Sequence, residues 1–258
     1  MAQSHGISIK KHYGQHFLRD QKVVEHMLEQ VHLTDRDNVL EIGCGDGFLT
    51  REIIKHTFAH FWVFEIDPQW ADFVKKSVSD KRLTIFVDNI LDVNFSGLEP
   101  YKPWTILSNL PYQITFPLLH LFYKNKELIK EGVIMVQEEV AQKIVKKSGR
   151  GYGFQSLFFQ HFFEWKLLQK VSPTAFLPPP KVYSRLLYFK PKKEPMPIPK
   201  EEQFWEFIKQ CFLQPRRTLK NNLMQLHYEI SKIPAEVLSL RAQQMNMQDF
   251  LEIWKLIS

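Results

Sequence analysis

The sequence predicts a parallel α/β sheet with helices on both faces, followed by a small all-helical domain. Short apolar runs alternate with amphipathic stretches along the first part of the chain. The apolar runs, which we expect to form strands, span residues 39–42, 61–66, 83–87, 105–107 and 133–136. This alternation is typical of parallel strands that are each joined to the next by a helix. Beyond residue 200 the periodicity is purely helical, which predicts the second domain.

Helical spacing of apolar residues supports the same arrangement. The predicted helices between the strands span residues 48–55, 69–77 and 116–123. Residues 20–31 form another amphipathic segment, with Asp20 placed to cap its first turn. Two later apolar runs, residues 167–171 and 185–189, have no clear helix between them. We therefore expect them to form an antiparallel pair at one edge of the sheet.

The domain boundary is predicted from a change in composition. Residues 191–200 are dense in Pro and Lys, which can continue neither a sheet nor a helix, so this segment is predicted to be a linker. Residues 1–190 then form the sheet domain, which includes an N-terminal arm of residues 1–20. Residues 201–258 form the helical domain.

Composition and charge narrow the function classes. The chain has 258 residues, of which 44% are hydrophobic and 24% charged, as expected for a globular protein. Lys and Arg outnumber Asp and Glu by 34 to 28, which favours a polyanionic partner such as nucleic acid. Two cysteines are too few for a disulfide framework, and no Cys/His cluster has zinc-ligand spacing, so we expect no metal. No apolar stretch is long enough for a membrane span and no secretion signal is evident, so we expect a cytoplasmic protein.

A glycine-rich loop follows the first predicted strand. Gly43, Gly45 and Gly47 can adopt positive φ and let the backbone approach a ligand closely, as in nucleotide-binding folds. No Gly-Lys-Ser/Thr follows, which excludes a phosphate loop of the Walker type. Glu41 and Asp46 would repel a pyrophosphate, whereas a cationic sulfonium with an amino-acid moiety would tolerate them.

Two acids at the ends of the next strands complete the pattern of a nucleoside site. Glu65, at the end of the second strand, can accept both hydroxyls of a ribose. Asp88, at the end of the third, can accept a hydrogen bond from an adenine amine. The alternatives are a solvated acid for Glu65 and a helix cap for Asp88. This arrangement fits S-adenosylmethionine at least as well as NAD.

The tetrapeptide Asn109-Leu110-Pro111-Tyr112 follows the fourth strand and predicts a pocket for an amine on a flat ring. The Asn109 side-chain carbonyl and the Leu110 backbone carbonyl can each accept one N–H of the amine. Pro111 holds Leu110 extended, and Tyr112 offers a stacking face. The two acceptors would direct the nitrogen lone pair out of the ring plane, towards a methyl donor, so that orientation is the main catalytic effect. In isolation the tetrapeptide would be an ordinary turn; after the glycine loop we favour methylation of an exocyclic amine.

Further motifs extend the match to a known family. They span residues 10–18, 41–45, 65–67, 174–184 and 214–223. Together with the tetrapeptide they resemble the ribosomal RNA adenine N6-dimethyltransferases that act on the small subunit, over roughly residues 10 to 225. The resemblance implies a Rossmann-like class I methyltransferase sheet that binds S-adenosylmethionine, with a C-terminal helical domain that contacts RNA.

The resemblance also implies roles for individual residues. Cofactor contacts are implied for His16, Leu18, Gly43, Gly45, Glu65, Ile66, Asp88, Asn89 and Asn109. The catalytic set is Asn109, Leu110, Pro111 and Tyr112, and Phe176 would stack on the target adenine opposite Tyr112. His16 stands where bacterial members usually carry Asn.

Basic residues near the motifs are predicted to bind RNA phosphates. They are Lys10, Lys11, Lys146, Lys147, Arg150, Arg216, Arg217 and Lys220. Taken singly, such residues are as often solvated surface groups. The expected partner is small-subunit rRNA within a pre-ribosomal particle, and we expect the protein to be a monomer.

The sequence therefore predicts an rRNA adenine N6-dimethyltransferase. Its substrate would be two adjacent adenosines in a loop near the 3′ end of small-subunit rRNA. One alternative is an adenine methylase of the antibiotic-resistance type that acts on large-subunit rRNA. Another is a non-catalytic ribosome-assembly factor on the same fold, and a small-molecule or DNA N6-methylase is a third.

Overall fold

The computed structural model describes residues 3–10, 13–224 and 228–258, and these form two compact units. The first unit comprises Met1–Ala141 and Glu164–Pro191, and the second comprises Gln142–Phe163 and Lys192–Ser258. The division differs from the predicted one in one segment, because residues 142–163 group with the C-terminal helices rather than with the sheet. Among the described residues, no helix is both long enough and apolar enough to cross a membrane.

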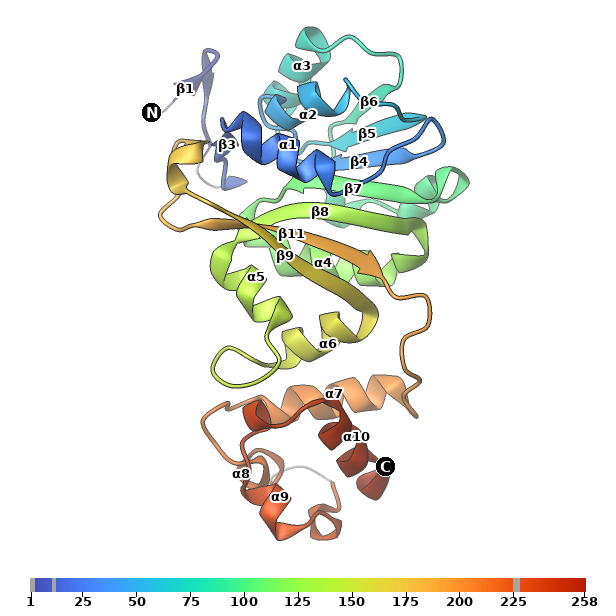
Figure 1. Cartoon of the computed structure of the whole chain (residues 1–258), viewed down its shortest axis with the longest axis vertical. Helices are drawn as coiled ribbons and strands as arrows, with labels where there is room; N and C mark the ends of the chain where they lie inside the picture. The colour runs from blue at the N-terminus through green and yellow to red at the C-terminus, as the bar shows by residue number, and fades with distance from the viewer. Residues whose placement is uncertain (1–2, 11–12, 225–227) are drawn as a thin grey trace. The chain divides into compact units, whose positions relative to one another are not determined.

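The first unit is built on a mainly parallel sheet with the strand order β6-β5-β4-β7-β8-β11-β9 (Figure 1). The strands are β4 (Asn38–Ile42), β5 (His60–Phe64), β6 (Leu83–Phe86), β7 (Trp104–Asn109), β8 (Ile129–Gln137), β9 (Phe163–Val171) and β11 (Ser184–Pro191). Neighbours from β6 to β8 pair in parallel, and β11 pairs antiparallel with β8. The predicted α/β sheet is confirmed, and the two later apolar runs lie in β9 and β11 at its edge.

Helices cover both faces of this sheet. The helices of the chain are α1 (Gln21–Glu29), α2 (Phe48–Ile53), α3 (Pro68–Ser77), α4 (Thr115–Lys124), α5 (Glu138–Val145), α6 (Phe154–Phe162), α7 (Glu201–Cys211), α8 (Leu219–Leu223), α9 (Ala235–Ser239) and α10 (Met247–Ile257). Apolar residues of α1, α2 and α3 share one buried cluster with alternate residues of β4, β5 and β8. On the other face Phe122 of α4 stacks on Phe189 of β11, with ring centroids 5.6 Å apart. Asp20 caps α1 as predicted, since its side chain accepts a hydrogen bond from the Lys22 backbone N–H.

The N-terminal arm and one later segment add four short strands. These are β1 (Gln3–Ser4), β2 (Ile7–Ser8), β3 (Phe17–Leu18) and β10 (Phe176–Leu177). β3 pairs antiparallel with β10, and β1 with β2. The pairing of β3 with β10 ties the end of the arm to a segment more than 150 residues further along the chain.

An aromatic face explains why α6 belongs to the second unit. Phe154, Phe158 and Phe162 lie four residues apart on α6 and therefore on one side of the helix. Their rings lie 6.2, 5.0 and 5.8 Å from the ring of Trp205 on α7. α5 and α6 were not among the predicted helices. The burial of these rings depends on their packing against Trp205, which is distant in the sequence.

The strand order creates a crevice at the carboxyl ends of the strands. β4 pairs with β5 on one side and with β7 on the other. The chain therefore leaves β4 towards one side of the sheet and leaves β7 towards the other. Open α/β sheets bind their ligands at the point where the strand order reverses in this way. The glycine loop follows β4, Glu65 follows β5, Asp88 follows β6, and Asn109 ends β7.

Gly132 on β8 offers a test of this packing. A Cβ at this position would lie 2.5 Å from the Phe189 ring and 2.8 Å from the Ile106 carbonyl oxygen. We expect Gly132→Ala to lower the free energy of unfolding by about 1–3 kcal/mol in urea denaturation, because the sheet must shift. Gly97→Ala is the matched control, since nothing lies within 4 Å of its Cβ position, and it should change stability by less than about 0.5 kcal/mol. Equal effects of the two substitutions would contradict this account.

Candidate active site

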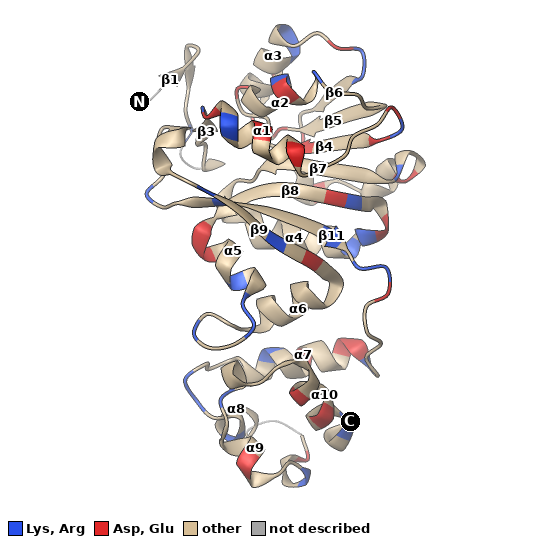
Figure 2. Cartoon of the chain, in the orientation of Figure 1, with Lys and Arg blue, Asp and Glu red and all other residues tan. Residues whose placement is uncertain are grey.

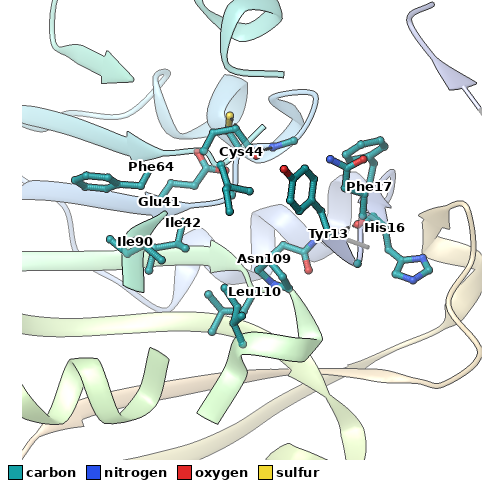
Figure 3. Close-up of a pocket in the computed structure, with 18 of the residues that line it drawn as sticks. Tyr13, His16, Phe17, Glu41, Ile42, Cys44, Phe64, Ile90, Asn109 and Leu110 are labelled. Carbon is teal, nitrogen blue, oxygen red and sulfur yellow. Dashed lines mark hydrogen bonds between the residues drawn. The ribbon is translucent and has the colours of Figure 1, made fainter. Parts of the chain in front are cut away.

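A cavity of about 220 Å³ lies at the carboxyl ends of β4 to β7 (Figure 3). It collects residues that are far apart in the sequence. Of the predicted site residues, it is lined by His16, Leu18, Gly43, Gly45, Glu65, Ile66, Asp88, Asn89, Asn109, Leu110, Pro111 and Tyr112. The structure thus brings together the predicted cofactor and catalytic positions, and it leaves Phe176 outside this wall.

The glycine loop has the backbone that only glycine adopts readily. The φ angles of Gly43, Gly45 and Gly47 are 75°, 52° and 79°. Gly45 is also sterically required, because a Cβ there would lie 2.7 Å from the ring of Phe17. The loop and the N-terminal arm therefore pack directly on each other at one end of the cavity.

Two buried carboxyl groups, those of Glu41 and Glu65, line this end of the cavity. Glu65 is 4% exposed, and its two oxygens accept the backbone N–H groups of Gly45 (3.0 Å) and Asp67 (2.9 Å). Burial raises the pKa of Glu65, and it raises the pKa of Glu41 to about 8. The Thr50 hydroxyl donates to Glu41 over 2.7 Å. The Cys44 thiol also donates to the oxygen that accepts from Gly45, over 3.8 Å. The oxygen that accepts from Asp67 keeps a further lone pair, so the group can still accept a hydroxyl donor.

The charge of Asp46 is compensated within the protein. Its carboxyl is 2% exposed and is paired with the Arg19 guanidinium. Asp46 therefore contributes less negative charge to the cavity than the sequence suggested. Glu41, with its pKa raised to about 8, is largely protonated and neutral at pH 7.

The two predicted residues after β6 differ in what they can offer. Asp88 is exposed. The side chain of Asn89 caps a short 3₁₀ helix (Ile90–Asp92) by accepting the Leu91 backbone N–H, and it also donates to Asp92. Because both polar atoms of the Asn89 side chain already have partners, a ligand would contact this residue through its backbone.

Asn109 is held in a defined orientation by the arm. Its Nδ2 donates to the carbonyl oxygen of His16 over 3.1 Å, which leaves Oδ1 as the group that can accept from a ligand. The Leu110 backbone N–H donates to the Met135 carbonyl over 3.1 Å, so the next peptide is fixed as well. The Tyr112 hydroxyl lies 2.6 Å from the Ser184 Oγ, and burial raises the pKa of Tyr112.

The arm is anchored by a residue that the sequence analysis did not single out. Asp67 is completely buried; its carboxyl oxygens accept from Lys10 Nζ (2.8 Å) and from Gln15 Nε2 (3.1 Å). Next to it, Phe17 packs against Trp70 with ring centroids 4.8 Å apart. The signal available in the sequence was the position of Asp67 two residues after Glu65, where it caps α3. Lys10 pairs with this buried carboxylate; its predicted contact with RNA stays a prediction.

Comparison with known proteins is decisive at this point. The family model described as ribosomal RNA adenine dimethylase matches residues 6–257. The chain belongs to the ribosomal RNA adenine dimethylase family. It is 34% identical to Ribosomal RNA small subunit methyltransferase A of Chlorobium phaeobacteroides over 252 residues, which cover 97% of this chain and 92% of that protein. The family resemblance seen in the sequence is thereby confirmed.

Solved structures show the same fold in two related enzymes. A dimethyladenosine transferase from Plasmodium falciparum superposes with a TM-score of 0.76 at 20% identity, covering 92% of this chain and 96% of that one. The 23S rRNA methyltransferase ErmE superposes with a TM-score of 0.73 at 22% identity, covering 93% and 99% of the two chains. These likenesses confirm the predicted methyltransferase fold.

Phe176 was predicted to stack on the target adenine, which stays a prediction; in the structure its side chain is buried and does not line the cavity. It is 4% exposed, pairs with Leu18 across β10 and β3, and belongs to the main apolar cluster. In that position the Phe176 ring packs in the core next to the end of the N-terminal arm. The predicted stacking would require it to leave this packing.

The basic residues predicted to bind RNA lie mostly in the second unit of this dimethylase. Lys146, Lys147, Arg150, Arg216, Arg217 and Lys220 are all exposed. Figure 2 shows Lys and Arg gathered in the segments that follow α5 and α7. Arg150 and Arg216 line one cavity of that unit together with Lys143 and Lys209. Lys11 lies outside the described residues, and RNA binding by this group stays a prediction.

Titration of Glu41 gives a pH prediction. Its pKa of about 8 exceeds the ordinary value of 4.5, so the folded protein holds a proton that the unfolded chain releases within this window. The free energy of unfolding should therefore fall as the pH rises from about 5 to 8. We expect melting temperatures to fall less steeply with pH in Glu41→Gln than in the wild type. Parallel curves for the two proteins would contradict the assignment.

Lys10 gives a second prediction, on stability. Lys10→Ala removes the charged partner of the buried Asp67 and should lower the free energy of unfolding by about 1–3 kcal/mol. Lys76→Ala is the matched control, because Lys76 pairs with Asp72 on the exposed face of α3 and should contribute at most about 0.5 kcal/mol. Chemical denaturation of both variants measures the difference. An unchanged free energy of unfolding in Lys10→Ala together with weakened RNA binding would contradict this account and favour the predicted contact of Lys10 with RNA.

Proposed function

We propose that this protein is a small-subunit rRNA adenine N6-dimethyltransferase that uses S-adenosylmethionine. Its substrate would be two adjacent adenosines in a loop near the 3′ end of that rRNA. The observation that carries the proposal is the orientation of Asn109, whose Nδ2 is tied to the His16 carbonyl so that Oδ1 can accept from an amine. Membership of the adenine dimethylase family supports the same substrate chemistry.

The cavity fits the proposed cofactor by its donor and acceptor set. When bound, S-adenosylmethionine would supply an electrophilic methyl group on a cationic sulfonium. Glu65 would hold the ribose hydroxyls, and the exposed carboxylate of Asp88 would accept the adenine amine. The backbone of Gly43 leaves room beside Pro111, whose ring atoms are 3.8 Å from the position of an added Cβ.

Catalysis would rest on orientation of the target amine. Asn109 Oδ1 and the Leu110 carbonyl would each accept one N–H, which turns the nitrogen lone pair out of the ring plane. Tyr112 would pack on the base. Its raised pKa keeps the hydroxyl protonated at neutral pH, so it serves as a partner of Ser184 rather than as a general base.

The proposed partner is rRNA in a small-subunit particle. Exposed Lys and Arg of the second unit and the excess of 34 basic over 28 acidic residues support contacts with phosphates. The target base would come from a single-stranded loop, since bases within A-form helices are poorly accessible. We place the protein in the cytoplasm as a monomer; the free, buried thiols of Cys44 and Cys211 fit a reducing compartment.

Mapping the modified positions tests the choice of substrate. Primer extension across both rRNAs, after incubation with under-methylated small and large subunits, should reveal stops solely on the small-subunit rRNA. The name of the Chlorobium relative, a small subunit methyltransferase, supports this outcome. Stops confined to the large-subunit rRNA would favour the resistance-type alternative.

Asn109→Ala separates catalysis from binding. Loss of the acceptor should lower the methylation rate by about 100-fold or more, because the amine is no longer oriented. Binding to the particle, measured by sedimentation, should stay near the wild-type level. Asn94→Ala is the matched control; Asn94 caps a 3₁₀ helix (Phe95–Tyr101) and does not line the cavity. A variant of Asn109 that methylates normally would contradict the proposed role, and equal loss of rate and binding would show that the pocket is not specifically catalytic.

A further inference from the structure

A short hydrogen bond joins Tyr112 to Ser184, a residue 72 positions further along the chain. The Tyr112 hydroxyl lies 2.6 Å from the Ser184 Oγ. Tyr112 lines the cavity, whereas Ser184 is completely buried and is not among the described residues that line it. Any effect of Ser184 on a ligand in the cavity therefore passes through Tyr112.

Ser184 begins β11, at a point where the strand is held on both sides. The residue before it, Tyr183, accepts the Glu138 backbone N–H over 2.9 Å. The residue after it, Arg185, donates to both carboxylate oxygens of Glu138, over 2.6 and 2.8 Å. Ser184 itself lies in the antiparallel register of β11 with β8. Because the backbone is fixed on either side, the Ser184 hydroxyl offers Tyr112 a partner at a defined position.

The Tyr112 side chain is held at its two ends. At the backbone end, Tyr112 begins a 3₁₀ helix (Tyr112–Ile114), and its carbonyl oxygen accepts the Thr115 hydroxyl over 3.2 Å. At the far end the phenol hydroxyl bonds to Ser184. The hydroxyl lies on the long axis of the ring, so this bond sets the direction of that axis and with it the first side-chain torsion. Without the bond, packing alone would hold the ring.

The direction of the Tyr112 ring matters because the proposed target base packs on its face. Asn109 Oδ1 and the Leu110 carbonyl would hold the amine edge of the base, and the Tyr112 ring would set its plane. Both must be correct for the nitrogen lone pair to point at the methyl group, and a misplacement of about 1 Å can cost about 100-fold in rate. An anchor for the ring therefore acts on the chemical step more than on binding.

We infer that Ser184 is a positioning residue for methyl transfer, which holds the Tyr112 ring so that the target adenine lies in line with the Asn109 acceptor. The inference rests on the proposed function and adds a residue to its machinery. Ser184 is not a catalytic residue, because it acts only through Tyr112. The amine pocket thus depends on β11 as well as on β7, the strand that it follows.

A double-mutant cycle separates this role from an ordinary packing role. Ser184→Ala removes the anchor, Tyr112→Phe keeps the ring but removes the hydroxyl that the anchor binds, and a third protein carries both substitutions. We measure kcat and KM for methylation of under-methylated small subunits, and the dissociation constant of S-adenosylhomocysteine by calorimetry. Melting temperatures establish that each variant is folded.

Ser156→Ala is the matched control. Ser156 is also completely buried, and its hydroxyl donates to the Lys143 carbonyl over 2.6 Å. It lies on α6 and does not line the cavity. The control therefore removes a buried hydroxyl and a bond of the same length without touching Tyr112, and its kcat should equal that of the wild type.

We expect each single substitution of the cycle to lower kcat about 5- to 50-fold, because the base is misplaced by part of an ångström. KM and the dissociation constant of S-adenosylhomocysteine should stay within about threefold of the wild type. The double variant should lose no more than about twice as much as either single variant, because both substitutions break one bond. A kcat of Ser184→Ala equal to that of the wild type, or a loss in the double variant equal to the product of the single losses, would overturn the inference.

NMR of protein that carries isotope-labelled tyrosine tests the same bond without the reaction. The Tyr112 ring signal is the one that disappears in Tyr112→Phe, and Ser184→Ala should shift or broaden it while the other tyrosine signals stay unchanged. An unchanged Tyr112 signal would overturn the inference. If Ser184→Ala does not fold, Tyr112→Phe still decides, because it breaks the same bond, and a wild-type kcat in that variant would contradict the role. A wild-type protein that fails to methylate the particle would instead refute the proposed function.

Discussion

The hydrogen bond from Asn109 Nδ2 to the His16 carbonyl joins the N-terminal arm to the end of β7, and the orientation of the Asn109 side chain depends on it. An amide that donates on one side presents its oxygen on the other, so this bond determines what Asn109 offers a ligand. The bond exists because the arm is tied to the buried carboxylate of Asp67. It also requires Gly45, which leaves room for Phe17. Contacts near the glycine loop thus orient the Asn109 side chain at the end of β7.

Buried carboxyl groups and exposed basic groups lie in different parts of the chain and have different uses. Glu65 is buried beside the glycine loop, where its oxygens accept the backbone N–H groups of Gly45 and Asp67. Lysines and arginines of the segments after α5 and α7 are exposed (Figure 2), where solvent and phosphates can reach them.

Local pattern was sufficient to predict the five parallel strands, the Asp20 cap and the cavity residues Gly43, Glu65, Asp88 and Asn109, because parallel strands bring the residues that follow them to one edge of the sheet. His16 and Leu18, which lie in the arm, were indicated only by the family resemblance. Contacts between distant segments were not predictable. The pairing of Lys10 with Asp67 spans 57 residues, and a lysine in a basic arm gives no local sign of a buried partner. The grouping of α6 with α7 depends on Trp205, and the burial of Phe176 depends on the pairing of β10 with β3.

The most direct test of the central claim is the identity of the methylated nucleoside. Under-methylated small subunits are incubated with the protein and labelled S-adenosylmethionine, and the rRNA is then digested to nucleosides and separated by chromatography with mass detection. The account predicts label in N6,N6-dimethyladenosine. Label confined to another base, to the ribose, or absent altogether would contradict it.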